Sequence, residues 1–153
     1  MSISAVGARW RSSAPYLQSI LRIVAAFLFM QFGSAKLFAF PAAILPNGGT
    51  VPLSDALTTQ IGLAAVLELV GGALLLVGLF TRPVAFVVAG EMAFAYFIGH
   101  APHGFWPVVN QGTPAILFCF VWLYLSAAGA GPWSLDARLR RGSGSVSGFR
   151  RAA

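Results

Sequence analysis

One apolar stretch constrains the fold of this chain more than any other feature. Residues 61–83 read IGLAAVLELVGGALLLVGLFTRP, and Glu68 is the one carboxylate in this run. A run of this length spans the hydrocarbon core of a bilayer as a helix. A carboxylate in the middle of such a helix is energetically expensive, so Glu68 requires either a partner or a function.

Two glycines accompany this carboxylate. Gly71 and Gly72 follow Glu68 by three and four positions, so a helix places all three residues on one face. Small residues on one face let the backbone of a neighbouring helix approach closely. We therefore expect Gly71 and Gly72 to mark a helix-packing contact beside Glu68.

The composition favours a membrane environment. Of the 153 residues, 58% are hydrophobic and 9% are charged, whereas soluble domains carry about 25% charged residues. The length suits one bundle of helices, so a single domain is expected. Cys119 is the only cysteine, so the chain can form neither an internal disulfide nor a CxxC redox pair.

The apolar pattern predicts an all-α membrane protein with a four-helix transmembrane bundle. Turn-rich loops at residues 41–58 and 99–113 separate three groups of apolar residues, and Pro83 fits the first helical position of the third span. Ser54 or Asp55 is expected to cap the second span. The predicted spans are residues 16–40, a segment from between 54 and 60 to just before 83, residues 83–98 and residues 113–128. The expected domains are a flexible basic N-terminus (1–15), the transmembrane domain (16–136) and a basic disordered tail (137–153).

A cleaved signal peptide is the competing interpretation of the first span. Arg22 would close the basic region, residues 23–32 would be the apolar region, and residues 33–35 (Gly-Ser-Ala) would precede the cleavage site. The apolar pattern resumes directly at Leu37 and Phe38, which favours an intact spanning helix.

The basic residues predict how the chain is oriented. With four spans, the arginines of both termini and of the turn between spans two and three fall on one side, and the two long loops contain no Lys or Arg. The positive-inside rule then places both termini in the cytoplasm. This clustering of the net charge of +6 fits anionic lipid headgroups better than nucleic acid. The arginines concerned are Arg9, Arg11, Arg82, Arg138, Arg140, Arg141, Arg150 and Arg151.

Polar residues inside the spans are the candidate functional groups. Depths counted at a rise of about 1.5 Å per residue predict two pairs, Arg22 with Glu91 and Lys36 with Glu68. The pairs could lock the first helix against the second and third, or form a proton relay or a polar pocket for a headgroup or quinone ring. Snorkelling of the two basic side chains is a further alternative. The candidate polar site comprises Arg22, Gln31, Lys36, Glu68, Glu91 and Asn110.

No sequence motif indicates a metal or a nucleotide. His100 and His103 lie in a proline-containing loop with no carboxylate or cysteine nearby, so a solvated loop is favoured over a metal site. The chain lacks a glycine-rich phosphate loop and a nucleophile elbow.

The arrangement of these residues resembles the DoxX family of small bacterial membrane proteins. The resemblance extends over residues 21–139. It rests on Arg22, Gly33-x-x-Lys36, Glu68-x-x-Gly71-Gly72, residues 79–82 (LFTR), Met92-Ala93, Asn110 and the ending GAGPWSLD at residues 129–136. It implies a four-helix bundle in a bacterial-type inner membrane and a link to redox complexes, with a quinone as the candidate cofactor.

Three functions follow as hypotheses. The first is an accessory or quinone-linked subunit of a membrane redox complex, with a soluble redox partner and with Glu68 in a quinone-accessible polar pocket. The second is a non-enzymatic scaffold whose arginine-rich ends recruit lipid or a soluble partner. The third is a solute or proton pathway through Glu91, Glu68 and Gln31. A second copy of the chain is a further candidate partner, and whether the chain is itself an enzyme stays open.

Overall fold

The computed structural model describes residues 3–141, and this part of the chain is helical, with no β-strand. Helix α1 (Ile3–Phe38) is followed by the short helix η1 (Leu53–Asp55). Helix α2 (Gln60–Val66), the π-helical turn η2 (Leu67–Gly71) and α3 (Gly72–Val77) form one continuous helical segment. After α4 (Thr81–Ala95) come the π-helical turn η3 (Tyr96–His100) and the short helix η4 (Ala101–His103). Helix α5 (Thr113–Ala128) and a short helix at residues 135–141 complete the described chain.

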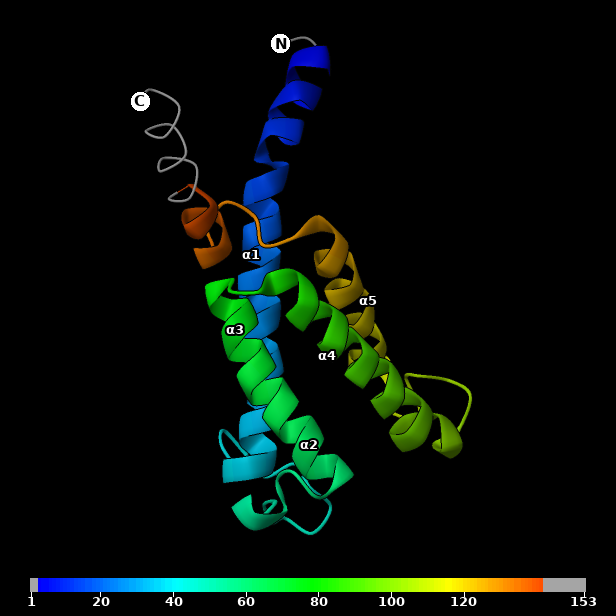
Figure 1. Ribbon diagram of the computed structural model, residues 1–153. Helices are drawn as coiled ribbons and strands as arrows, with labels where there is room; N and C mark the ends of the chain where they lie inside the picture. The colour runs from blue at the N-terminus through cyan, green and yellow to red at the C-terminus, as the bar shows by residue number, and fades with distance from the viewer. Residues whose placement is uncertain (1–2, 142–153) are drawn as a thin grey trace, which may run out of the picture.

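Two helical layers flank the long helix α1. The α2–η2–α3 segment packs along α1, and α4 packs along α5 as an antiparallel pair (Figure 1). The start of α1 and the helix at residues 135–141 lie at the same end of the bundle, and the loop between α1 and α2 lies at the opposite end. The bundle therefore has two distinct ends. Its buried charged residues include Arg22 and Glu68.

Three of the helical segments are long and apolar enough to cross a membrane. They are Trp10–Phe38, Gln60–Val77 and Thr81–His103, with 29, 18 and 23 residues. Helix α5 is also apolar, but its 16 residues are fewer than the roughly 20 that a bilayer core requires. The all-helical membrane fold agrees with the sequence, whereas the four-span count and the cytoplasmic termini stay predictions.

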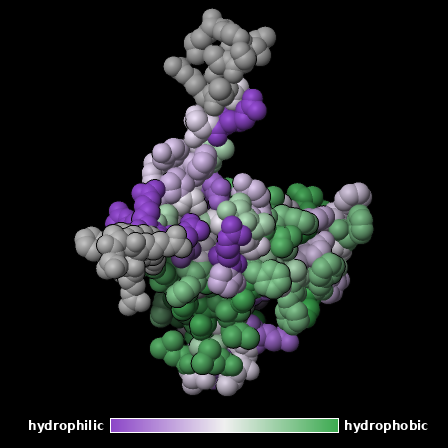
Figure 2. All heavy atoms as spheres, turned by 45° about the horizontal axis from the view of Figure 1, so that its top comes forward, coloured by the Kyte–Doolittle hydropathy of each residue, from purple (hydrophilic) through white to green (hydrophobic). Residues whose placement is uncertain are grey.

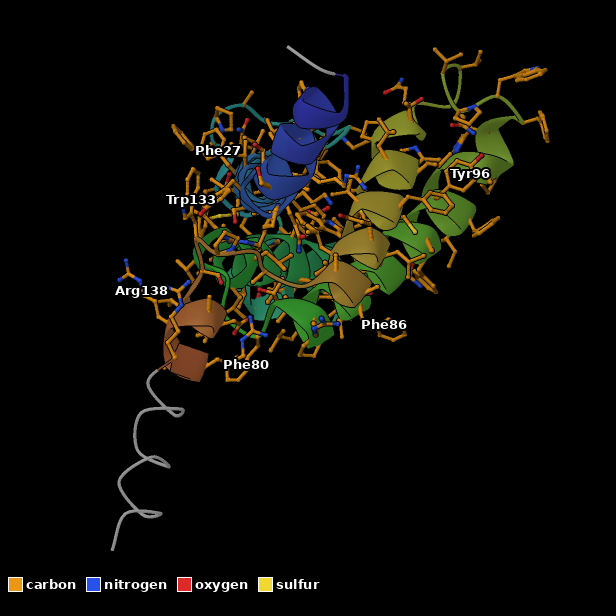
Figure 3. All side chains as sticks on the ribbon, turned by 90° about the horizontal axis from the view of Figure 1, so that it is seen from above. Phe27, Phe80, Phe86, Tyr96, Trp133 and Arg138 are labelled. Carbon is orange, nitrogen blue, oxygen red and sulfur yellow. The ribbon has the colours of Figure 1, made fainter. Side chains whose placement is uncertain are left out.

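The exterior is apolar and the centre is built from small and aromatic residues. Phe27 and Phe86 point outward (Figure 3), and apolar side chains cover the visible helical surface below a more polar end (Figure 2). Inside, Trp122 packs against Phe29 and Phe118 at ring-centroid distances of 5.3 and 5.9 Å. An apolar exterior over a packed aromatic core is the arrangement expected for helices in lipid.

Both chain ends are more helical than the sequence predicted. The first span was expected from residue 16, whereas α1 begins at Ile3 and continues through Pro15; the flexibility of residues 1–15 stays a prediction. The disordered tail was expected from residue 137, yet helix continues to residue 141. The remainder of that predicted tail, residues 142–153, lies outside the described residues.

Two predicted helix starts are also corrected. The cap of α2 is Thr59, whose hydroxyl accepts a hydrogen bond from the Gly62 amide at 3.1 Å, instead of Ser54 or Asp55. Helix α4 begins at Thr81, so Pro83 is its third residue rather than its first. Residues 56–58 (Ala-Leu-Thr) form turns, and the sequence did not distinguish these turns from a first helical turn.

Candidate functional site

An ion pair joins α1 to the turn η2. The Lys36 ammonium lies 2.6 Å from Glu68 Oε1 and 2.7 Å from Glu68 Oε2. The Lys36 side chain is 18% exposed and that of Glu68 is 3% exposed. This pairing was predicted from the sequence and is present. Because both groups are largely removed from solvent, each compensates the desolvation of the other.

Glycine contacts bring the backbones close enough for this pair to form. A Cβ atom on Gly33 would lie 2.6 Å from the Ala65 carbonyl oxygen, so α1 crosses the helix of Glu68 with almost no side chain between them. A Cβ on Gly72 would meet Met30 of α1 at 2.5 Å, and one on Gly71 would meet Val88 of α4 at 2.8 Å. The two adjacent glycines therefore serve two different neighbouring helices.

Glu68 lies within a π-helical turn. Turn η2 (Leu67–Gly71) interrupts the regular α-helix at the carboxylate, and a second π-helical turn, η3 (Tyr96–His100), extends α4. Such turns are rare and are found frequently at functional sites. Sequence periodicity did not predict either turn. A π-turn changes which residues share a helix face, and this change is not visible in a run where nearly every residue is apolar.

Both π-helical turns border the same cavity, which we call the ion-pair cavity. Its volume is about 560 Å³. Lys36 and Glu68 supply its charges, and residues from α1, α4, α5 and the two long loops supply the other walls. The lining residues are Phe29, Phe32, Lys36, Ile44, Glu68, Met92, Ala95, His100, Val108, Gln111, Thr113, Pro114, Ala115 and Phe118. A mostly apolar pocket with a few convergent polar groups is typical of small-molecule sites.

Glu91 does not form its predicted pair. Its two carboxyl oxygens are buried and have no hydrogen-bond partner among the described residues. It lies within electrostatic range of Glu68 and Lys36, but it is not among the residues that line the ion-pair cavity. The prediction that Arg22 pairs with Glu91 is therefore wrong.

Arg22 instead binds backbone carbonyls at the opposite end of the bundle. Its side chain is fully buried and donates hydrogen bonds to the carbonyl oxygens of Leu75 and Leu76, the latter at 2.6 Å. It also donates to Ala130 O at 2.9 Å and Trp133 O at 2.5 Å. A cation at the C-terminal end of α3 also interacts favourably with the helix dipole. Sequence depth alone could not reveal these partners, because they are main-chain atoms of distant segments.

Two more charges act on helix ends at this same end. Asp136 accepts hydrogen bonds from the Phe80 and Thr81 amides, each at 2.9 Å, where α4 begins. Arg82 donates to Ala127 O at 2.6 Å, where α5 ends. We call Arg22, Arg82 and Asp136 the charged clasp. Asp136 was missed as a site residue, although it closes the GAGPWSLD ending that was singled out in the sequence.

The remaining candidate residues are separate from the ion pair. Gln31 lines a second cavity of about 400 Å³ with Leu28 and Pro41 among its walls. Asn110 shapes the loop before α5, because its amide donates to Gly104 O at 2.7 Å and its side-chain oxygen accepts from Gly112 N at 2.8 Å. The ring of His100 is hydrogen-bonded to Asn110 O at 3.0 Å, which connects this loop to the ion-pair cavity.

Comparison with known proteins places the chain in a family. The family model described as DoxX matches residues 17–101, more than half of the chain. An "Uncharacterized protein" of Haemophilus influenzae is 42% identical over 125 residues, which cover 80% of this chain and 90% of that protein. No solved structure matches. The matched region contains the ion pair, both π-helical turns and the two packing glycines, and the chain belongs to the DoxX family.

Proposed function

We propose that this DoxX membrane protein binds a quinone in the ion-pair cavity and serves as an accessory subunit of a redox complex in a bacterial-type inner membrane. The observation that carries the proposal is that the buried Lys36–Glu68 pair opens onto a cavity of about 560 Å³ with aromatic walls. This volume lies within the range of about 300–1,000 Å³ that is usual for pockets that bind small molecules.

The chemistry of the pair suits a quinone headgroup. A lysine ammonium has three donors, and the two oxygens of Glu68 take up two of them. The third donor can bind a quinone carbonyl oxygen, while Glu68 can accept a proton from a quinol hydroxyl. Phe29, Phe32 and Phe118 supply apolar surface for the ring.

An accessory role suits the chain better than complete redox chemistry. Cys119 is the only cysteine, so any thiol pair must come from a partner subunit. The partner and the topology, with four spans and both termini in the cytoplasm, are part of the proposal. The positive-inside pattern of the arginines supports this orientation.

A continuous proton pathway is less well supported. Gln31 and Glu68 line different cavities, and Glu91 is not among the lining residues of either one. The three residues of that hypothesis therefore do not share one hydrated space among the residues that the structure describes.

Quinone binding to purified protein in detergent tests the proposal. A short-chain ubiquinone analogue should quench tryptophan fluorescence in a saturable manner, because Trp122 stacks on the cavity residue Phe118. Glu68→Gln should weaken binding about tenfold or more, because the Lys36 ammonium loses the carboxylate that holds it at the cavity. Glu91→Gln is the matched control, because it removes a carboxylate from the adjacent helix without altering a cavity residue, and its effect should be less than about threefold.

Two outcomes would contradict the proposal. The first is a Glu68→Gln protein that is folded and binds the analogue as tightly as the unmodified chain. The second is an equal loss in Glu91→Gln, which would move the function from the cavity to a relay shared by both carboxylates.

A further inference from the structure

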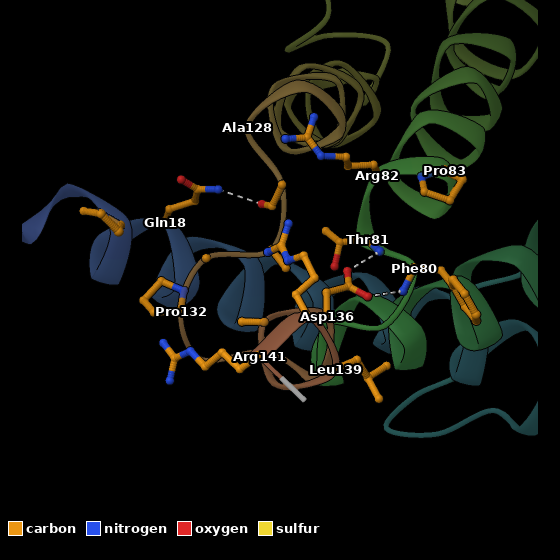
Figure 4. Close-up of a pocket in the computed structure, with 16 residues that line it drawn as sticks. Gln18, Phe80, Thr81, Arg82, Pro83, Ala128, Pro132, Asp136, Leu139 and Arg141 are labelled. Atoms are coloured by element: carbon orange, nitrogen blue, oxygen red, sulfur yellow. Dashed lines mark hydrogen bonds between the residues drawn. The ribbon is translucent and has the colours of Figure 1, made fainter. Parts of the chain in front are cut away.

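A further cavity, larger than the two described above, lies at the end of the bundle that holds the charged clasp. Its volume is about 810 Å³, and we call it the basic cavity. Arg82 borders it from the start of α4, and Arg140 and Arg141 border it from the final helix (Figure 4). No function described above uses this cavity, because the ion-pair cavity is formed by other residues.

The charge of the basic cavity is positive. Three arginines line it against the single carboxylate of Asp136. Both oxygens of that carboxylate already accept amide hydrogens of Phe80 and Thr81. Arg82 donates to carbonyls at the end of α5, whereas Arg140 and Arg141 are exposed. Guanidinium groups beside a cavity are suited to phosphate, which they bind with paired hydrogen bonds.

A buried hydroxyl beside this cavity lacks a partner. Thr81 lines the basic cavity and is fully buried, and its Oγ1 has no hydrogen-bond partner among the described residues. Buried polar atoms in native structures are nearly always paired. The hydroxyl is closed off from solvent, so a phosphate oxygen in the cavity would reach it only if the Thr81 side chain turned.

The apolar rim favours a lipid over a soluble phosphate compound. Phe80 and Leu139 line the cavity and are 64% and 61% exposed. At the same end Tyr16 and Trp133 pack with ring centroids 5.7 Å apart, and both are exposed. Exposed Tyr and Trp are typical of the membrane–water interface. The ligand site therefore combines phosphate-binding groups with an apolar edge at interfacial depth.

We propose that the basic cavity binds the phosphate of an anionic phospholipid headgroup, with Arg140 and Arg141 as its contacts and with Phe80 and Leu139 against its acyl chains. Basic pockets beside membrane helices bind anionic headgroups in this manner. The site would bind one lipid in a defined position, which distinguishes it from general attraction between a basic surface and a membrane.

Native mass spectrometry of the full chain in detergent tests the site. The probes are phosphatidylglycerol and phosphatidylcholine with identical acyl chains, together with free glycerol 3-phosphate. We expect one phosphatidylglycerol per chain, bound about tenfold more tightly than phosphatidylcholine. Replacing both Arg140 and Arg141 with Gln should weaken phosphatidylglycerol binding about tenfold or more. Thr81→Val, which keeps the shape of the side chain, should change it by less than about twofold, because the Thr81 hydroxyl is closed off from the cavity.

The matched control is Arg138→Gln. Arg138 is exposed on the same short helix but does not line the cavity, and it is labelled in Figure 3. A specific site requires that Arg138→Gln change binding by less than about twofold while Arg141→Gln alone weakens it more. Equal losses in these two single variants would overturn the proposal, since general surface charge would then explain the binding.

Two further outcomes would also overturn it. Equal affinity for phosphatidylcholine would show that the phosphate charge and the arginines do not select the lipid. Competition by glycerol 3-phosphate at the same concentrations as phosphatidylglycerol would identify a soluble phosphate ligand instead. Circular dichroism of each variant confirms that its helices are retained before binding is compared.

Discussion

The two ends of the bundle bury charge in different ways. At the clasp end, Arg22 is surrounded by four backbone carbonyls, and its hydrogen bonds connect α1, α3 and the segment after α5. At the other end, Lys36 and Glu68 neutralise each other and border the ion-pair cavity. The comparison contrasts a buried charge that main-chain atoms satisfy with a charge pair that borders open volume, where we propose that a quinone binds.

The largest expected effect comes from removing the buried arginine. Arg22→Met leaves the carbonyls of Leu76, Ala130 and Trp133 without this donor, whereas Leu75 O still accepts the Gly78 amide, and each unsatisfied buried group costs about 1–3 kcal/mol. We expect a loss of about 3 kcal/mol or more in the free energy of unfolding. Unfolding in mixed detergent micelles, followed by circular dichroism, measures it. A loss below 1 kcal/mol would show that the clasp end does not depend on Arg22.

Stability at the ion pair should respond differently, because both charged residues can be replaced together by apolar ones. Lys36→Met leaves Glu68 buried without its cation and should reduce the free energy of unfolding by about 3 kcal/mol. Combining it with Glu68→Leu should restore most of that stability, since two apolar groups then replace two charges. The same unfolding assay on the single and double variants measures the coupling energy. If the losses of the two single variants simply add in the double variant, the Lys36–Glu68 pair cannot be replaced by apolar residues. The proposed contrast with Arg22 would then be lost.

A smaller effect is expected at the start of α4. Asp136→Ala removes the carboxylate that accepts from the Phe80 and Thr81 amides, and loss of a helix cap typically costs about 1 kcal/mol. Asp55→Ala is the control, since Asp55 lies in the loop before α2 and does not cap it. Comparable unfolding free energies for the two variants would argue against a stabilising role of Asp136 in the clasp.

Much of the fold could be predicted because the apolar runs in the sequence have nearly the same bounds as the helices. The apolar run at residues 113–128 coincides with α5, and the loop at residues 41–58 is irregular apart from η1. The pairing of Lys36 with Glu68 could also be predicted, because depth in a bilayer restricts which charges can meet. Cavities and π-helical turns could not be predicted, since they depend on how helices are rotated about their axes.

The wrong pairing of Arg22 has the same physical origin. Counting residues gives the height of a side chain in the bundle, and it gives neither its direction nor the backbone atoms that surround it. Asp136 was overlooked because its partners are the amides of residues 80 and 81, which no charge pattern reveals. Its position at the end of a family motif was the signal available in the sequence.

The π-helical turn at Glu68 accommodates one extra residue between the two halves of its helix. A π-turn closes its hydrogen bond one residue later than an α-turn, so the loss of one residue after Glu68 within Leu67–Gly71 would leave a regular α-helix whose two halves keep nearly the same facing. Such a shortened chain would keep its hydropathy profile and its helical content. Only residues inside the turn, Glu68 among them, would change direction, so this shortened chain would show whether the turn itself aims the carboxylate at Lys36.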